Sequence, residues 1–245
     1  MVIGSSSEDP FLFHTFGQLY FYLMVTLTLG DKEATIPTDL TLDQWCQVVK
    51  WDVFDQDNWS RILSIVTGLP KEEFDLVDTK SLELGIIFIS HSLSRRKETQ
   101  HKDFNDMKLG EWVDLDVYIS QGLEKSIKDV LRVLGAETTS ASEALYVIDK
   151  YNHWRTYILR TFSYLFDYDE NTSGDTESDV NWKEVGQSWY RIIVGLANDN
   201  LLDLDKVTDE PVRKVFQFMT LQKQKNQEEQ MKQLKAKHDL QRNRR

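Results

Sequence analysis

Hydrophobic and polar residues alternate along two stretches of the chain, and a period of two is typical of β-strands. In residues 19–29 every odd position is apolar, from Leu19 to Leu29. The turn-forming residues 30–33 and the short stretch 35–37 follow directly, and we expect them to return the chain as a second strand. Residues 112–119 alternate in the same way, so they predict a further strand.

Apolar residues elsewhere recur every three or four positions, which is typical of helices packed on one face. Thr41 with Gln44, and Ser140 with Glu143, have the spacing of capping boxes, so each pair predicts a helix start. Gly68 is expected to end a helix. The helices predicted in this way cover approximately residues 41–49, 55–67, 80–93, 123–134, 140–167, 182–198 and 209 onward.

The expected fold is therefore mainly α within the α+β class: a helical domain with a small antiparallel sheet and a protruding C-terminal helix. The distribution of charged residues divides the chain into two parts. Residues 213–245 contain ten Lys or Arg against three Asp or Glu, whereas the whole chain has a net charge of −11. We predict an acidic helical body over 1–208 and a basic C-terminal helix over 209–245, with the distal half of that helix projecting into water.

The composition of the chain argues against a membrane and against nucleic acid as partners. The most apolar segment, 11–29, has the period of a strand and is interrupted by His14, Gly17 and Gln18, so we expect no membrane partner. An acidic body does not suit the phosphate backbone of nucleic acid, so nucleic acid is not expected as a partner either. The single Cys46 excludes an internal disulfide.

An acidic stretch, DENTSGDTESDV at residues 169–180, resembles a calcium-binding loop. Oxygen-bearing residues occupy the first, third and fifth positions and glycine the sixth, as an EF-hand requires. The twelfth position, which should supply a bidentate Glu, is Val180, so the stretch is better explained as a solvated connector at 168–181. The weak calcium candidates are Asp169, Asn171, Ser173, Asp175 and Glu177.

Other candidate chemistry is sparse. Asp114 and Asp116 would share one face of the predicted strand, but an exposed strand face explains them better than acid–base catalysis. The sequence has no Gly-rich phosphate loop and no pair of His residues at metal-ligand spacing. We therefore predict a protein that is not an enzyme and needs no cofactor, with a calcium-supported enzyme as the least favoured hypothesis.

Apolar residues become rare in the last helix. Beyond Leu221 the only large apolar residues are Met231, Leu234 and Leu240, too few for a sustained coiled-coil seam. These three side chains are the predicted partner-binding residues, because a sparse apolar stripe on a polar helix can enter a groove of another protein. The edge of the strand 19–29 is a second candidate contact. Formation of a homo-oligomer stays open.

Three segments together resemble proteins of large tailed bacteriophages that are described as tail-assembly chaperones or virion-morphogenesis proteins. The segments are TLDQWCQVVKW followed by WSRILSIVTGLPKEEFDLV, then LGEWVDLDVYIS, then the stretch that begins SWYRIIVGLANDNLLDLDKVTDEP. The resemblance covers approximately residues 41–230, and its most specific part is Trp189–Asn200. Its motifs are hydrophobic, so they carry no catalytic residue to this chain.

The resemblance implies a protein of the infected host's cytoplasm that shields apolar helices of another virion protein until assembly. The alternative is a permanent virion component, such as a tail, baseplate or internal cargo protein. Both readings make this chain a protein-binding protein, and they differ in whether it remains in the finished particle.

Overall fold

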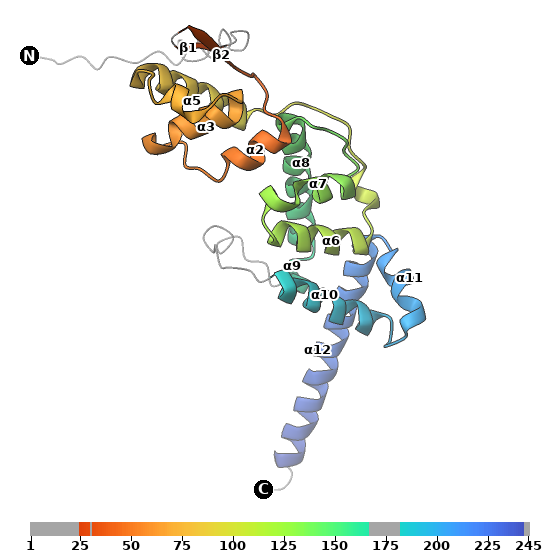
Figure 1. Cartoon of the computed structure of the whole chain (residues 1–245). Coiled ribbons are helices and arrows are strands. Elements are labelled where there is room, and N and C mark those ends of the chain that lie inside the picture. The colour runs from red at the N-terminus through yellow and green to blue at the C-terminus, as the bar shows by residue number, and fades with distance from the viewer. Residues whose placement is uncertain (1–24, 30, 167–181, 243–245) are drawn as a thin grey trace, which may run out of the picture. The chain divides into compact units, whose positions relative to one another are not determined.

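The computed structural model describes residues 25–29, 31–166 and 182–242. These residues form two compact units. Unit 1 extends to Arg95 and includes residues 140–142, and unit 2 comprises residues 96–139 and 143 onward. The described chain is mainly helical with one two-stranded antiparallel sheet, which confirms the predicted fold class (Figure 1).

The sheet of unit 1 pairs β1 (Val25–Leu29) with β2 (Lys32–Ile36), and Leu27 lies opposite Ala34. Alternate side chains of both strands are buried against α3 (Trp59–Thr67) and α5 (Thr79–Ser94). The alternation from residue 25 to 29 thus forms a strand as predicted. Residues 19–24 of the predicted strand lie outside the described residues.

Local capping signals set the helix boundaries of unit 1. Thr41 and Gln44 form the predicted capping box at the start of α2 (Leu42–Val48). Gly68 ends α3 with a φ of 76°, a left-handed conformation that glycine adopts without steric cost. Val49 lies just after the last residue of α2 and is 40% exposed, although its spacing from Leu42 and Trp45 predicts a place on the buried face.

The remaining elements of unit 1 are short. The predicted helix 55–67 begins later than expected: a 3-10 turn at Gln56–Asn58, capped by the side chain of Asp55, precedes α3, which starts at Trp59. The helix α4 covers Lys71–Phe74. Residues 140–142 join this unit through Asp39, whose carboxylate accepts hydrogen bonds from the hydroxyls of Ser140 (2.6 Å) and Ser142 (2.8 Å).

Unit 2 contains the longer helices. They pack around a core of aromatic side chains, in which Trp112, Tyr151 and Phe216 have no exposed surface. In chain order the elements are a 3-10 turn at Phe104–Asp106, α6 (Leu109–Ser120), α7 (Leu123–Val133), α8 (Ala141–Thr161), α9 (Ser163–Phe166), α10 (Trp182–Leu196), a 3-10 turn at Leu201–Asp203, α11 (Leu204–Thr208) and α12 (Val212–Arg242).

The predicted strand 112–119 is wrong, because this segment is most of the helix α6. Leu109, Trp112 and Leu115 are fully buried at a spacing of three, as on one helix face. The helices α7 and α10 both pack on α6. A helix covered by more than one neighbour has a wide apolar surface, and in this sequence that surface produces an apparent period of two.

The division of the chain into an acidic body over 1–208 and a basic helix over 209–245 stays a prediction. The C-terminal helix α12 begins at Val212, three residues after position 209, and Pro211 precedes its first turn. The first turns of α12 contribute buried side chains to unit 2, because Val212, Val215 and Phe216 are at most 7% exposed.

Candidate protein-binding surface

The distal part of α12, defined here as residues 224–242, is a helix with little packing. Every residue from 224 to 238 is exposed. The predicted partner-binding side chains Met231 and Leu234 are 66% and 60% exposed. Leu240 belongs to the same helix, but its side chain lies outside the described residues. The helix therefore presents at least two apolar side chains to solvent.

Lys223 marks the point where α12 leaves the packed part of unit 2. Its ammonium group donates a hydrogen bond to the backbone oxygen of Tyr164 at 2.7 Å and lies 3.4 Å from that of Leu165. The same group lies 5.1 Å from the centre of the Tyr164 ring, and the Tyr164 hydroxyl donates to the side-chain oxygen of Gln227. The short helix α9 is thus held against one turn of α12.

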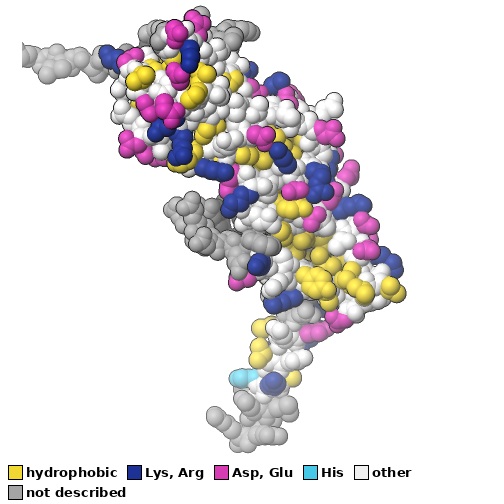
Figure 2. All heavy atoms as spheres, in the orientation of Figure 1, with side chains coloured by type: hydrophobic (Ala, Val, Ile, Leu, Met, Phe, Trp, Pro, Cys, Tyr) yellow, Lys and Arg dark blue, Asp and Glu magenta, His cyan; other side chains and the backbone are white. Residues whose placement is uncertain are grey.

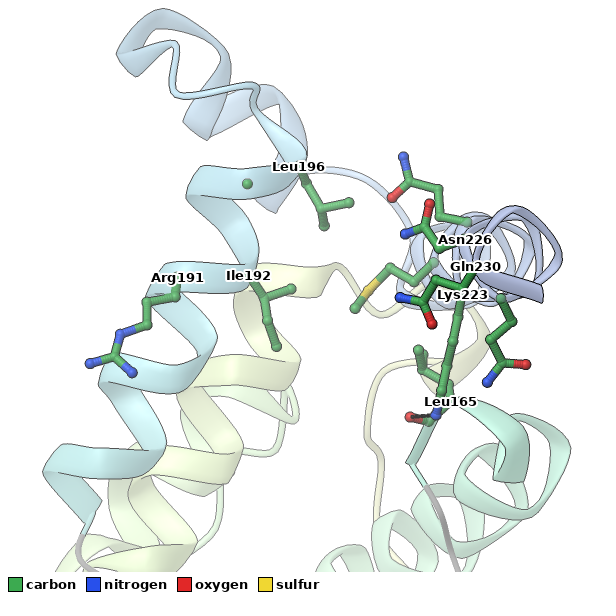
Figure 3. A pocket seen from close by; sticks show the side chains of 11 residues that line it. Leu165, Arg191, Ile192, Leu196, Lys223, Asn226 and Gln230 are labelled. Carbon is green, nitrogen blue, oxygen red and sulfur yellow. Dashed lines mark hydrogen bonds between the residues drawn. The ribbon is translucent and has the colours of Figure 1, made fainter. Parts of the chain in front are cut away.

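A groove of about 620 Å³ lies between α10 and α12 beside this contact. Figure 3 shows Ile192 and Leu196 of α10 directed toward α12, whereas Arg191 extends away from it. The groove is lined by Leu165, Arg191, Ile192, Gly195, Leu196, Met219, Gln222, Lys223, Asn226, Gln227 and Gln230. Its α10 side is therefore largely apolar, and its α12 side is formed mainly by side-chain amides.

Further apolar side chains are exposed on the elements around the groove. Figure 2 shows hydrophobic side chains gathered over the region of α10 and α11 and sparser along α12. The large apolar residues that are at least half exposed on α10, α12 and the turn before α11 are Tyr190, Leu201, Leu202, Phe218 and Leu221, in addition to Met231 and Leu234. Monomeric proteins rarely expose apolar side chains together, and such patches mark interaction sites.

The carboxylate Asp116 has a structural position. It lies on α6, where its side chain is 12% exposed and its Oδ1 is 3.0 Å from Nη2 of Arg155. Its Oδ2 accepts a hydrogen bond from the indole nitrogen of Trp189 at 3.0 Å. Burial alone would lower the pKa of Arg155, but the negative Asp116 and the neighbouring Tyr151 outweigh burial and raise it. Asp116 thus connects α6, α8 and α10.

Asp114 does not share a strand face with Asp116, because both residues lie on the helix α6. Partial burial raises the pKa of Asp114, with Arg132 opposing and Glu111 adding to the shift. Burial also raises the pKa of Tyr151, with the nearby Asp116 adding to the shift and Arg155 opposing it. These shifts follow from packing within the helical core.

The weak calcium candidates Asp169, Asn171, Ser173, Asp175 and Glu177 lie outside the described residues. Among residues 25–29, 31–166 and 182–242, no cluster of three His, Cys, Asp or Glu side chains has an arrangement suited to a metal ion.

The edges of the sheet are the second predicted contact. Within the described part of the chain, β1 and β2 each have one neighbouring strand, the other member of the hairpin. The opposite edge of each strand is therefore not paired with a described strand. Edges of this kind can accept a strand from another chain.

The groove was missed by the sequence analysis. Its residues come from three helices separated by up to 65 positions, and their apolar members fit the ordinary pattern of packed helices.

A comparison with known protein families, curated proteins and solved structures finds no match for this chain. None of the described helices combines the length and the apolar character needed to span a membrane.

Proposed function

We propose that this chain is a non-enzymatic protein of tailed-bacteriophage assembly that binds another virion protein through exposed apolar surfaces. The observation that carries the proposal is the distal part of α12. There a helix continues through residues 224–238 with every residue exposed, and it includes Met231 and Leu234. Helices are stabilised mainly by tertiary packing of an apolar face, so an unpacked helix with apolar side chains suits a partner's surface.

The assignment to phage assembly is supported only by the sequence resemblance. The exposed apolar side chains of α12 support protein binding in general. A helix of this kind can lie in a groove of its partner and use its apolar side chains as anchors. The edge of the hairpin that pairs with no described strand offers a second, backbone-mediated contact. We place the activity in the host cytoplasm during assembly.

The proposal is tested by affinity purification of the tagged full-length chain from infected cells, followed by quantitative mass spectrometry. We compare the wild type with a Met231→Lys/Leu234→Lys variant. Because two apolar anchors become charged, we expect the co-purified virion protein to decrease by at least about tenfold, which corresponds to about 1.4 kcal/mol.

The matched control is Gln233→Lys/Ala236→Lys, which adds the same two charges at exposed positions on the other face of the same helix. This control should retain the partner. Equal recovery by all three proteins would contradict a role for the distal helix, and recovery of no virion protein by the wild type would contradict the phage assignment.

The alternative is a permanent component of the virion, and the exposed apolar side chains are compatible with it. Mass spectrometry of purified particles separates the two functions. An assembly factor is absent from the particle, whereas a tail, baseplate or cargo protein is present at a fixed copy number.

A further inference from the structure

The turn between α10 and α11 presents two leucines to solvent. Leu201 and Leu202 are 76% and 81% exposed, which makes them the most exposed large apolar side chains of the described part of unit 2. We call residues 198–205 the acidic tip, because they include Asp199, Asp203 and Asp205 and neither Lys nor Arg. The tip thus combines two apolar side chains with carboxylates.

The backbone of the acidic tip is fixed by its own hydrogen bonds. Asn198 and Asp199 have left-handed φ angles of 51° and 59°, a conformation that Asn and Asp adopt more readily than other non-glycine residues. The amide of Asp199 donates to the carbonyl of Val194 at 3.1 Å, and the side chain of Asn200 accepts from the amide of Leu202 at 3.1 Å. An ordered turn loses little conformational entropy when it binds, so it is a preorganised contact.

Two carboxylates of the acidic tip lack a positive neighbour. Asp203 is paired with Lys206 at 2.6 Å. Asp199 and Asp205 are exposed, and neither has an ion-pair partner among the described side chains. Protein interfaces place apolar side chains at the centre and opposite charges facing each other at the rim. The complement of this tip is therefore an apolar surface flanked by lysines.

The distal part of α12 has that chemistry. Lys235 follows Met231 by four residues and Lys237 follows Leu234 by three, so each lysine lies beside an exposed apolar side chain on the helix surface. Both lysines are exposed and have no ion-pair partner among the described side chains. Residues 231–245 contain six Lys or Arg against one Asp.

The two complementary surfaces do not meet within one chain. Both belong to unit 2, yet the leucines of the acidic tip and the apolar side chains of the distal part of α12 are all at least 60% exposed. One copy of the protein therefore leaves both surfaces open, and a second copy supplies each of them with its complement.

We infer that the acidic tip of one copy binds the distal part of α12 of a second copy, with leucines against Met231 and Leu234 and with carboxylates beside the lysines. Each copy has one of each surface, so the contact closes as a two-fold pair or continues as a row of copies. The inference rests on the proposed function in one respect, because the virion protein uses the same two anchors. Self-association then covers these anchors until the virion protein replaces the second copy.

Sedimentation velocity of the purified full-length protein tests whether copies associate. We expect the average sedimentation coefficient to rise between about 5 μM and about 200 μM protein, the range of a weak contact. At about 0.5 M salt the screening length is about three times shorter than at about 0.05 M. The same degree of association should then require at least about tenfold more protein.

Two variants identify the surfaces that meet. Leu201→Ser/Leu202→Ser removes the leucines of the tip, and Met231→Ser/Leu234→Ser removes the apolar side chains of the helix. Each variant alone should associate at least about tenfold more weakly than the wild type. A mixture of the two should recover binding, because one variant retains the helix and the other retains the tip. Fluorescence anisotropy of the labelled tip variant measures this recovery, and circular dichroism verifies that both variants remain folded.

The matched control is Gln233→Ser/Ala236→Ser, at exposed positions on the other face of α12, and it should associate as the wild type does. A wild type that stays monomeric at about 200 μM and low salt would overturn the inference. So would association lost in only one of the two variants, because that result assigns the contact to two tips or to two helices. A mixture that binds no better than either variant alone would overturn it as well.

The proposed function fails or stands independently of these results. The tip variant should recover the virion protein from infected cells at the wild-type level, because its distal helix is intact. If self-association fails while Met231 and Leu234 still determine that recovery, only this inference fails. If recovery is insensitive to those two residues, the proposed function fails on its own test.

Discussion

The proximal and distal parts of α12 belong to one uninterrupted helix but have opposite surroundings. In the proximal part Phe216 is fully buried, and its ring contacts those of Trp112 and Trp189 with centroids 5.3 Å and 6.1 Å apart. In the distal part Met231 and Leu234 are exposed. The comparison separates two uses of apolar side chains: the first set holds unit 2 together, and the second set is available to a partner. Substitutions should reveal this difference in the free energy of unfolding.

The largest effect is expected for Phe216→Ala. Removing a fully buried aromatic ring leaves a cavity among other rings, and such substitutions cost about 3–5 kcal/mol. Urea denaturation followed by tryptophan fluorescence measures the change. A loss below about 1 kcal/mol, the range of ordinary substitutions, would show that the proximal part is not the anchor of α12.

Asp116→Ala should cause the second-largest loss of unfolding free energy. It leaves Arg155 without its carboxylate and removes the hydrogen-bond acceptor of the Trp189 indole. Breaking a buried ion pair costs about 3–5 kcal/mol. Arg155 is 35% exposed, so water will compensate in part and we expect about 2–3 kcal/mol. The same denaturation experiment tests this, with Asp114→Ala on the same helix as the control.

Gly195→Ala should stabilise the free protein by no more than about 1 kcal/mol, the helix-interior value, because Gly195 is the next-to-last residue of α10. Beyond its own helical turn, the added methyl group would have no described atom within 4 Å. Thermal denaturation should show a higher Tm. A lower Tm would mean that an interaction within the chain needs glycine here.

The smallest effect is expected for Met231→Ala/Leu234→Ala. Neither side chain is buried, so unfolding should change by no more than about 0.5 kcal/mol. Urea denaturation of the double variant next to Phe216→Ala gives the comparison directly. A large destabilisation would show that the distal part packs against the protein in solution, and it would abolish the contrast between the two parts of α12.

Sequence patterns predicted the elements whose signals are local. The capping pair Thr41 and Gln44 specifies a helix start, and Gly68 a helix end, whatever the rest of the chain does. The exposure of Met231 and Leu234 was also predictable, because the polar residues around them provide no apolar face to bury. In the segment 112–119 the pattern misled, since contacts with α7 and α10 determine which residues of α6 are covered.

The groove depended on tertiary structure for the same reason. Leu165, Ile192 and Met219 come from three helices, and each has the sequence context of an ordinary core residue. Only the arrangement of α9, α10 and α12 leaves these side chains beside open space. No spacing within one helix encodes that arrangement, so the sequence could not predict the groove.

Because α12 continues without a break through Lys223, its distal part is already helical before a partner binds. A segment that must fold as it binds loses conformational entropy at that moment. Here the packed proximal turns have already nucleated the helix, so the distal side chains are presented at fixed spacing before any encounter. Recognition should therefore involve rigid docking, with a small heat-capacity change limited to the contact itself.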